Sequence, residues 1–255
     1  MKAETNLQKI LAQDEFAVTC ECNPPRGIDV DLTLKNAAQL KGKVDAVNVN
    51  DNAVASVRMS SWAMSKIFLD MGIEPVLQMT TRDRNRIALQ SDLLGALALG
   101  TQNVLCLTGG HPARGDHPEA KKVFDLDSIQ WIAAVRQMRD QGRLMNGKEI
   151  SGRPRLFIGG VANPFVESLE LHIICLHKKI AAGAEFVQTQ PVLEIKRFKA
   201  WLNLARDHGL ADRCSVIAGV LALKSVQMAE HLRNNVPGIM IPEAIIDRLR
   251  AVSED

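Results

Sequence analysis

The stretch "EPVLQMTTRDRNRIALQSDLLGALALGTQNVLCLT", residues 74–108, decides the fold class of this sequence. It begins with an apolar run (74–80), continues with a segment of helical period (84–99) and ends with a second apolar run (103–108). A strand, a helix and a strand in this order predict a βαβ unit with parallel strands.

The same alternation runs along the whole chain. We predict seven strands, at 16–22, 45–50, 74–80, 103–108, 155–161, 185–190 and 214–220. A helix is expected after each of them, at 30–42, 54–71, 84–99, 127–141, 165–182, 194–208 and 224–234, with one more short helix in "IPEAIIDRLRAV", 241–252. No linker or low-complexity run interrupts this pattern, so we expect a single domain over residues 1–255.

Polar residues favour a closed barrel over an open doubly wound sheet. The central strands of an open sheet read as nearly continuous apolar runs, because helices cover both faces. A barrel instead directs alternate residues inward, and polar groups at the carboxyl ends of its strands line a site. Here pairs of polar residues share a face near four strand ends: Thr19 and Glu21, Asn48 and Asn50, Gln78 and Thr80, Gln188 and Gln190. We therefore predict an α/β fold, a (β/α)8 TIM-type barrel.

Composition excludes several classes of protein. The 255 residues carry a net charge of +2, which gives no general attraction to nucleic acid or to an anionic membrane. The five cysteines are odd in number and lie mostly in apolar runs, which is typical of reduced thiols in the cytoplasm. Cys20 and Cys22 have the wrong spacing for a zinc site, so no metal is expected. Neither a signal peptide nor 18 consecutive apolar residues occur, so we expect a cytoplasmic protein without a membrane segment.

Glu21 is the first candidate for chemistry. It is a lone carboxylate in an apolar strand, and the prolines of "NPPRG", 23–27, end strand pairing just after it. Burial in an apolar cavity would raise the pKa of this carboxyl and make it a general acid near neutral pH. A structural ion pair with a nearby Arg or Lys, such as Arg26, explains the same residue equally well, so both interpretations stay open at this point.

The segment "TTRDRNR", 80–86, lies where a strand meets a helix, and Thr81 or Asp83 is suited to cap that helix. Its arginines would bind a phosphate or a carboxylate at the helix N-terminus, or would be solvated in the first turn. We favour the solvated interpretation for all three, Arg82, Arg84 and Arg86.

The loop "TGGHPARGDHPEAKKVFDLDS", 108–128, is long and contains glycines, as functional barrel loops often do. It matches neither a Walker A loop nor GxGxxG. His111 and His117, with Asp116, offer metal ligands, but flexible loop histidines more often bind nothing. Asp125 or Asp127 is expected to cap the next helix.

Gln190 ends a predicted strand and offers both a donor and an acceptor without charge. Such an amide suits the edge of a pterin, a flavin or a nucleobase. It would equally well tie two loops together, and the residue alone does not decide between these roles.

Taken in order, these segments resemble the methylenetetrahydrofolate reductase family from about residue 16 to residue 245. The matching segments are "CECNPPRG", "TTRDRNRIALQSDLLGALALG", "NVLCLTGG", "VFDLDSI", "GGVANP", "KKIAAGAEFVQTQP" and "GIMIPEAIIDRL". The resemblance implies an eight-stranded α/β barrel that holds FAD, with FMN as the alternative. It also implies reduction of 5,10-methylenetetrahydrofolate to 5-methyltetrahydrofolate, in one-carbon metabolism and methionine biosynthesis.

The resemblance also implies roles for individual residues. Glu21 matches the general acid that protonates folate N10, and Gln190 matches the glutamine that hydrogen-bonds the pterin. Lys179 matches the lysine near the flavin phosphates. The remaining implied flavin contacts are Asn50, Gln78, Thr80, Thr108, Gly109, Gly110, Phe124, Asp125 and His172.

The sequence departs from the family pattern in several places. Gln78 stands where many members have a histidine, and His172 stands where some have an acidic group. Gly110 replaces the family aspartate after the fourth strand, and Asp116 is the nearest carboxylate that follows. The chain also stops at Asp255, where relatives continue through an eighth strand and helix.

These features lead to one expected function and two alternatives. We expect a flavoenzyme that takes a folate substrate and receives electrons from NAD(P)H or from a protein donor, as an oligomer or with a partner subunit. The first alternative is a non-catalytic barrel subunit of a folate or one-carbon complex, and the second is a flavin-independent pterin-binding enzyme.

Overall fold

The computed structural model describes residues 3–165, 167–236 and 238–253. Contacts within the chain define two compact units. Unit 1 comprises residues 1–160 and 182–184, and unit 2 comprises residues 161–181 and 185–255. Each unit is described by itself, and the single domain expected over 1–255 stays a prediction.

Parallel strands form the framework of both units. In unit 1, strands pair in sequence order, each with the next: β1 (Thr19–Cys22), β2 (Ala46–Val49), β3 (Pro75–Thr80), β4 (Asn103–Leu107) and the first residues of β5 (Phe157–Ala162). In unit 2, β6 (Phe186–Pro191) pairs in parallel with β7 (Ser215–Gly219), and the register shifts between Gln188 and Pro191. All seven predicted strands are confirmed.

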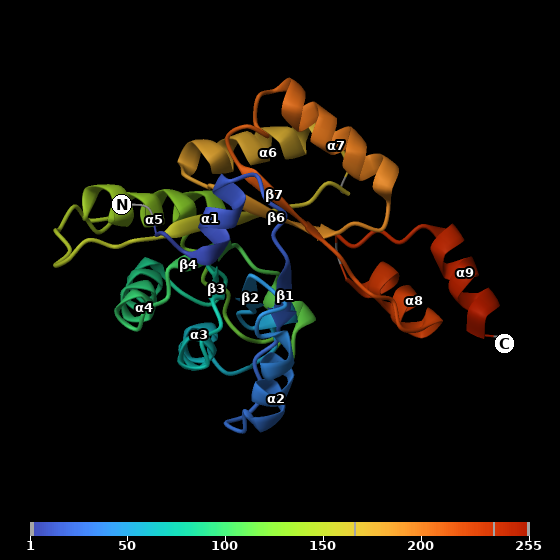
Figure 1. Ribbon diagram of the computed structural model, residues 1–255, viewed down its shortest axis with the longest axis horizontal. Helices are drawn as coiled ribbons and strands as arrows, with labels where there is room; N and C mark the ends of the chain where they lie inside the picture. The colour runs from blue at the N-terminus through green and yellow to red at the C-terminus, as the bar shows by residue number, and fades with distance from the viewer. Residues whose placement is uncertain (1–2, 166, 237, 254–255) are drawn as a thin grey trace. The chain divides into compact units, whose positions relative to one another are not determined.

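A helix follows each strand, as Figure 1 shows. Unit 1 contains α1 (Asn6–Ala12), α2 (Asp31–Leu40), α3 (Ser61–Asp70), α4 (Arg86–Ala98) and α5 (Ser128–Gln141), with the short 3-10 helices η1 (Ala53–Ala55) and η2 (Pro112–Arg114). Unit 2 contains α6 (Leu169–Ala182, without its last residue), α7 (Ile195–Asp207), α8 (Val226–Asn235) and α9 (Glu243–Ser253). The fold class is therefore the predicted α/β barrel type, with seven of eight βα units among the described residues.

Each unit buries its own apolar side chains. In unit 1, α3 packs on β2 and β3 around Phe68, and α5 packs on β4 around Trp131. In unit 2, Trp201 of α7 lies in a cluster with residues of α6 and β6, and Ile246 of α9 packs with Ala229 of α8. Burial of these large side chains is the main stabilising contribution in both units.

Local details differ from the prediction at two helix starts and agree with it at a third. Helix α1 was not predicted, although "TNLQ", 5–8, has the spacing of an N-terminal capping box, and the Thr5 hydroxyl accepts the Gln8 N–H. Asn85 caps α4, in place of Thr81 or Asp83. The reason is that residues 81 and 82 still donate backbone hydrogen bonds to the end of β4, which delays the helix. Of the two aspartates proposed for α5, Asp127 is the cap.

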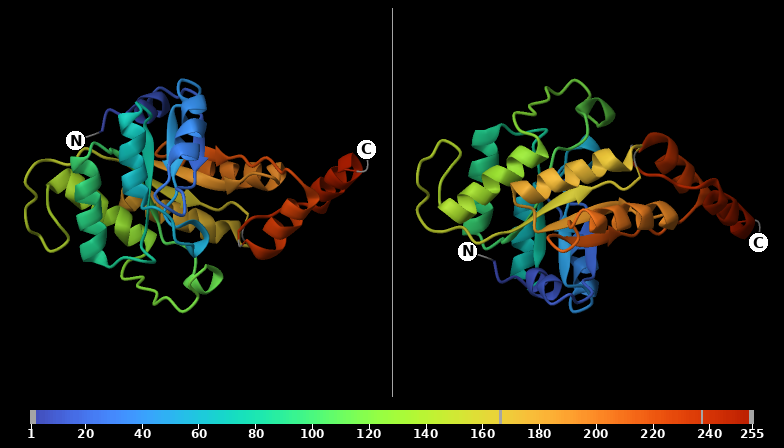
Figure 2. Two further views of the ribbon diagram at one scale, coloured as in Figure 1. Left: turned by 90° about the horizontal axis from the view of Figure 1, so that it is seen from below. Right: turned by 90° about the horizontal axis from the view of Figure 1, so that it is seen from above.

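Opposite ends of the strands in unit 1 carry different structures. Helix α1 lies at the amino ends, whereas the loop between β4 and α5, which contains η2, lies at the carboxyl ends (Figure 2). Because the carboxyl ends of parallel strands form the sites of α/β barrels, the loop end is the place to look for function.

Candidate active site

Glu21 is the residue before the last of β1, and its side chain is exposed. Among the described residues its carboxylate forms no hydrogen bond and no ion pair. The alternative pairing with Arg26 is therefore wrong, since Arg26 approaches Asp116 instead, at 4.0 Å. The expected burial is not found either, because the Glu21 side chain is exposed. Glu21 is thus an accessible carboxylate that no neighbour occupies.

Asn50 lies just beyond the end of β2 and is 5% exposed. Its backbone N–H donates to the Cys22 carbonyl at 3.0 Å, and its Nδ2 donates to the Asn23 side chain at 2.8 Å. The Oδ1 atom is buried and accepts no hydrogen bond from the described residues. A buried acceptor without a donor is costly, so a ligand or water N–H or O–H at this atom is expected to stabilise it.

A buried carboxylate that the sequence analysis did not single out lies next to Asn50. Asp51 is 2% exposed, and its Oδ2 accepts the Thr80 N–H at 2.8 Å and the Thr80 hydroxyl at 2.9 Å. Arg84 donates to both Asp51 oxygens, at 2.6 and 3.2 Å. A charged residue directly after an apolar strand was the available signal, because a charge that is buried there requires a partner.

Arg82 and Arg84 are not solvated as we predicted, whereas Arg86 is an exposed residue in the first turn of α4. Arg82 is 2% exposed and donates to Asp83 and to the carbonyls of Asn52 and Gly110. Arg84 is paired with Asp51, and Arg86 is paired with Asp125. The carboxylates that bind these side chains belong to the protein, so neither full solvation nor an empty anion site describes them.

Gly109 and Gly110 differ in the space around them. Gly109 has φ +85°, and a Cβ added there would lie 3.1 Å from Arg82 Cβ and 3.3 Å from Thr80 Cβ. A Cβ added at Gly110 would meet no atom within 4 Å. Position 109 therefore requires glycine, because of its positive φ and because a Cβ would crowd Arg82 and Thr80. The space beside Gly110 admits a side chain or a ligand.

Thr108 and Gln78 also lie at this end of unit 1. The Thr108 hydroxyl accepts the Ser128 N–H at 3.1 Å, which ties the end of β4 to the start of α5. Gln78 is half-buried in β3, and Ser61 donates to its backbone carbonyl at 2.8 Å. Among the described residues the Gln78 side-chain amide forms no hydrogen bond, so its donor and its acceptor remain available.

The β4–α5 loop is held by two carboxylates. Asp125 accepts the Arg86 N–H and two guanidinium N–H groups, each at 2.8 Å, and these bonds lower the pKa of Asp125 to about 2. Its neighbour Phe124 is half-buried with φ +40°. Asp116 accepts the Val57 N–H and pairs with His117, so its oxygens contact the β2–α3 loop.

Unit 2 carries the other three predicted site residues. Lys179 Nζ donates to the Val161 carbonyl at 2.5 Å. Burial lowers the pKa of His172, and the charges of Lys179 and Arg197 lower it further, which favours a neutral imidazole. Gln190 is half-buried at the end of β6, and its backbone carbonyl accepts the Thr189 hydroxyl at 2.8 Å.

Thiol and metal chemistry find little support in the described residues. Burial, Cys20 and Glu21 together raise the pKa of the Cys22 thiol to about 11, so it stays protonated at neutral pH. Within the described ranges no group of three His, Cys, Asp or Glu side chains is arranged to hold a metal ion. The described helices also include none that is long and apolar enough to cross a membrane.

A profile of the family described as methylenetetrahydrofolate reductase matches residues 6–255. The chain belongs to this family. A probable methylenetetrahydrofolate reductase (NADPH) from Caenorhabditis elegans is 24% identical over 197 residues, which are 77% of this chain and 28% of that protein. Methylenetetrahydrofolate reductase 2 from Schizosaccharomyces pombe is 23% identical over 185 residues, 72% of this chain and 28% of that protein. The chain thus matches only 28% of the length of these curated reductases.

Solved structures share the fold of this methylenetetrahydrofolate reductase family member at low identity. A Clostridium thermocellum protein, described as binding two copies of 5-methyl-5,6,7,8-tetrahydrofolic acid, has a TM-score of 0.64 at 17% identity. The alignment covers 96% of this chain and 79% of that one. For 2,3-dimethylmalate lyase, a PEP mutase/isocitrate lyase superfamily member, the TM-score is 0.56 at 11% identity, with 100% and 96% covered.

Proposed function

We propose that this chain catalyses the flavin-dependent reduction of 5,10-methylenetetrahydrofolate to 5-methyltetrahydrofolate. The observation that carries this proposal is the exposed and unpaired carboxylate of Glu21 at the carboxyl end of β1. The family membership supports the reaction class, and the folate named for the Clostridium thermocellum protein supports a folate ligand.

The proposed roles of the side chains follow from their chemistry. Glu21 donates its proton to folate N10, the bond between N10 and the methylene carbon breaks, and a 5-iminium folate forms. The bound reduced flavin supplies the hydride that converts this methylene carbon to a methyl group. Gln190 orients the pterin through its uncharged amide, and water returns a proton to the exposed Glu21 carboxylate after each turnover.

The residues of unit 1 fit a flavin ring in part. The orphaned Oδ1 of Asn50 is an acceptor for a ring N–H, and the open space at Gly110 leaves backbone groups accessible to a flat ring. The Gln78 amide and the backbone at Thr108 and Gly109 supply further neutral groups. Asp125 is occupied by Arg86, so a contact from Asp125 to a flavin requires that its oxygens be shared.

In unit 2, Lys179 is proposed to hold the flavin phosphates and His172 to add a neutral hydrogen bond. FAD is the proposed cofactor, with FMN as the alternative. NAD(P)H or a reduced protein supplies the electrons, and the product enters one-carbon metabolism and methionine biosynthesis in the cytoplasm.

The visible absorption spectrum of the purified chain tests this proposal. We expect bound FAD after incubation and gel filtration, and anaerobic bleaching of its visible band by 5-methyltetrahydrofolate, which runs the reaction in reverse. Loading with FMN in a parallel sample separates the two cofactors. A colourless protein that binds neither flavin would overturn the flavoenzyme.

Gly110 favours a second candidate, a non-catalytic folate-binding subunit. The family resemblance predicts an aspartate at this position, and here the position holds no carboxylate. Binding of 5-methyltetrahydrofolate without flavin, and without turnover when FAD and NADPH are supplied, would select this candidate. Turnover without flavin would instead select a flavin-independent pterin enzyme.

A further inference from the structure

Asp51 is a buried charge for which the proposed mechanism has no use. Its side chain is fully inaccessible to solvent. A carboxylate in such a place is costly unless several donors surround it, and four donor contacts do so here. A specific role is therefore expected for this buried, hydrogen-bonded carboxylate beside the candidate binding site.

The geometry shows what Asp51 does locally. The paired register of β2 and β3 ends at Val49 and Leu77. Beyond that point the Thr80 N–H, which a strand carbonyl would otherwise accept, is accepted by Asp51 Oδ2 at 2.8 Å. The Thr80 hydroxyl donates to the same oxygen at 2.9 Å. Asp51 thus continues the attachment of β2 to β3 with a side chain after the backbone ladder has ended.

Arg84 fixes the orientation of this carboxylate. Its Nη1 and Nη2 donate to the two Asp51 oxygens, and its Nε donates to Asp92 at 2.8 Å. Burial opposes the charge of Arg84, but the two carboxylates outweigh burial and raise the pKa of the guanidinium. The bidentate pair leaves the Asp51 carboxylate little freedom to rotate.

The contacts of Asp51 also fix the position of Asn50, which immediately precedes it in the chain. On the β1 side, Asn50 is held by the Cys22 carbonyl and by the Asn23 side chain. On the β3 side, the next residue is held by Thr80 and Arg84. Asn50 is therefore anchored from both directions, and its Oδ1 acceptor has no donor among the residues that the structure describes.

We propose that Asp51 is a positioning residue that acts through Asn50 and Thr80 on the ring system bound at the carboxyl ends of β2 and β3. This inference rests on the proposed function, because the bound ring is the proposed flavin. Asp51 itself touches neither substrate nor cofactor. Its carboxylate determines where the Asn50 amide and the Thr80 side chain stand when the ring binds.

Three variants of the full chain test the proposal. Asp51→Asn removes the charge and turns an N–H group toward donors, and Asp51→Glu keeps the charge but moves it by one methylene group. Asp92→Asn is the matched control, because it removes the other carboxylate from Arg84 without touching Asn50 or Thr80. FAD affinity is measured by titration, together with the visible spectrum of the bound flavin and the thermal unfolding midpoint.

We expect both Asp51 variants to bind FAD about tenfold more weakly, or worse, and to shift the flavin absorption band. Asp92→Asn should stay within about twofold of the unaltered chain, with an unshifted band. If Asp51→Asn does not fold, the test rests on Asp51→Glu, whose cooperative thermal unfolding shows that it is folded. Restored affinity and an unchanged band in Asp51→Glu would overturn the positioning role, as would equal losses in Asp51→Asn and Asp92→Asn.

The unaltered chain separates this inference from the proposed function. If it binds no FAD, the flavoenzyme is overturned and the positioning role with it. If it binds FAD and is reduced by 5-methyltetrahydrofolate while the Asp51 variants behave like it, only the positioning role is overturned.

Discussion

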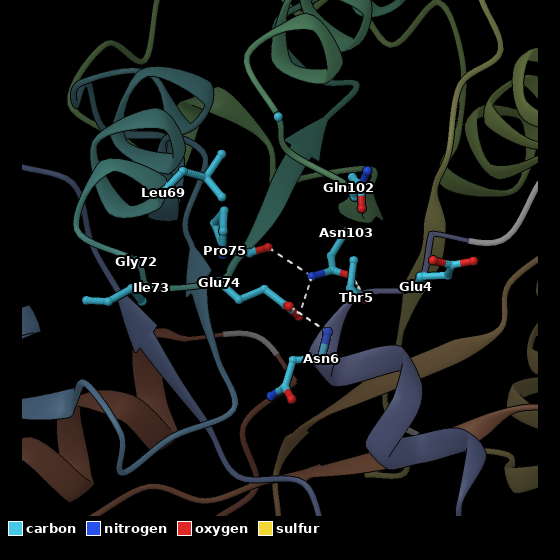
Figure 3. Close-up of a pocket in the computed structure, with 11 residues that line it drawn as sticks. Glu4, Thr5, Asn6, Leu69, Gly72, Ile73, Glu74, Pro75, Gln102 and Asn103 are labelled. Atoms are coloured by element: carbon cyan, nitrogen blue, oxygen red, sulfur yellow. Dashed lines mark hydrogen bonds between the residues drawn. The ribbon is translucent and has the colours of Figure 1, made fainter.

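The amino and carboxyl ends of the strands in unit 1 both carry a glutamate and an asparagine, but these residues have different roles at the two ends. At the amino ends of β3 and β4, Glu74 accepts the Asn6 backbone N–H at 2.7 Å and the Asn103 amide at 2.9 Å (Figure 3). It also accepts the Leu7 backbone N–H at 2.9 Å. At the carboxyl ends of β1 and β2, Glu21 accepts no hydrogen bond from the described residues and Asn50 has an unpaired oxygen.

The difference separates stability from binding. Asn103 is 1% exposed, accepts the Thr5 hydroxyl at 2.8 Å and donates to Glu74 and to the Pro75 carbonyl, so its polar atoms are all used. A cavity of about 350 Å³ adjoins this network, but no predicted site residue lines it. Polar groups whose hydrogen bonds are all formed stabilise the fold, whereas polar groups that lack a hydrogen-bond partner are available to bind a ligand.

Glu21→Gln gives the largest effect and tests the carboxyl end directly. Because the N–H groups of an amide are too weakly acidic to protonate N10, we expect folate turnover to fall by about 10² to 10⁴. Reduction of bound flavin by the electron donor should change by less than about twofold, since that half-reaction needs no acid at N10. Stopped-flow measurement of the two half-reactions checks this, and an equal loss in both would make Glu21 structural.

Glu74→Gln should lower the free energy of unfolding by about 2 kcal/mol, because the NH₂ group of glutamine would then face one of the N–H donors that the carboxylate accepts. The free energy of unfolding in urea measures the loss, and FAD affinity should not change. Glu4→Gln is the control, since the exposed Glu4 side chain lines the same cavity and its carboxylate forms no hydrogen bond or ion pair with the described residues. An unchanged unfolding midpoint in Glu74→Gln, or weaker FAD binding, would remove the distinction between the two ends.

The sequence was sufficient for structure that local patterns determine. The strand expected at 103–108 is found at Asn103–Leu107, and Asp127, one of the two aspartates predicted to cap the next helix, caps α5. The alternation of short apolar runs and helical segments is enough for the barrel class, because each run predicts its own strand or helix.

Pairing between distant residues was not accessible in the same way. Arg84 meets Asp51 across 33 positions, and Arg86 meets Asp125 across 39. Local composition made these arginines resemble a solvated first turn, and nothing nearby in the sequence identifies their partners. The strand pattern supplied Glu21 and Gln190 as candidates and the resemblance to relatives supplied their roles, but neither identified the buried Asp51 next to Asn50.

Gly109→Ala and Gly110→Ala form a matched pair at the carboxyl end. An alanine at φ +85° costs about 1–2 kcal/mol, and its Cβ also crowds Arg82 and Thr80. The alanine at 110 meets open space and should change stability by less than about 0.5 kcal/mol. Urea unfolding compares the two, and equal losses would show that the open space at 110 is filled in solution.

The Asp116–His117 pair gives the smallest effect, confined to the loop. The hydrogen bond from His117 lowers the pKa of Asp116, and the same bond raises the pKa of His117. The pair therefore holds the loop at pH values above the lowered pKa of Asp116. Its contribution is complete between the ordinary pKa of aspartate and the ordinary pKa of histidine. It is lost as the pH falls through the lowered pKa of Asp116 or rises through the raised pKa of His117. An NMR titration of the His117 ring should show its pKa falling in Asp116→Asn but little changed in Arg26→Gln, because Arg26 lies 4.0 Å from Asp116. Since both side chains are exposed, the free energy of global unfolding should change little over this pH range. A large loss of stability would mean that the loop at the carboxyl ends of the strands stabilises the fold as the amino ends do.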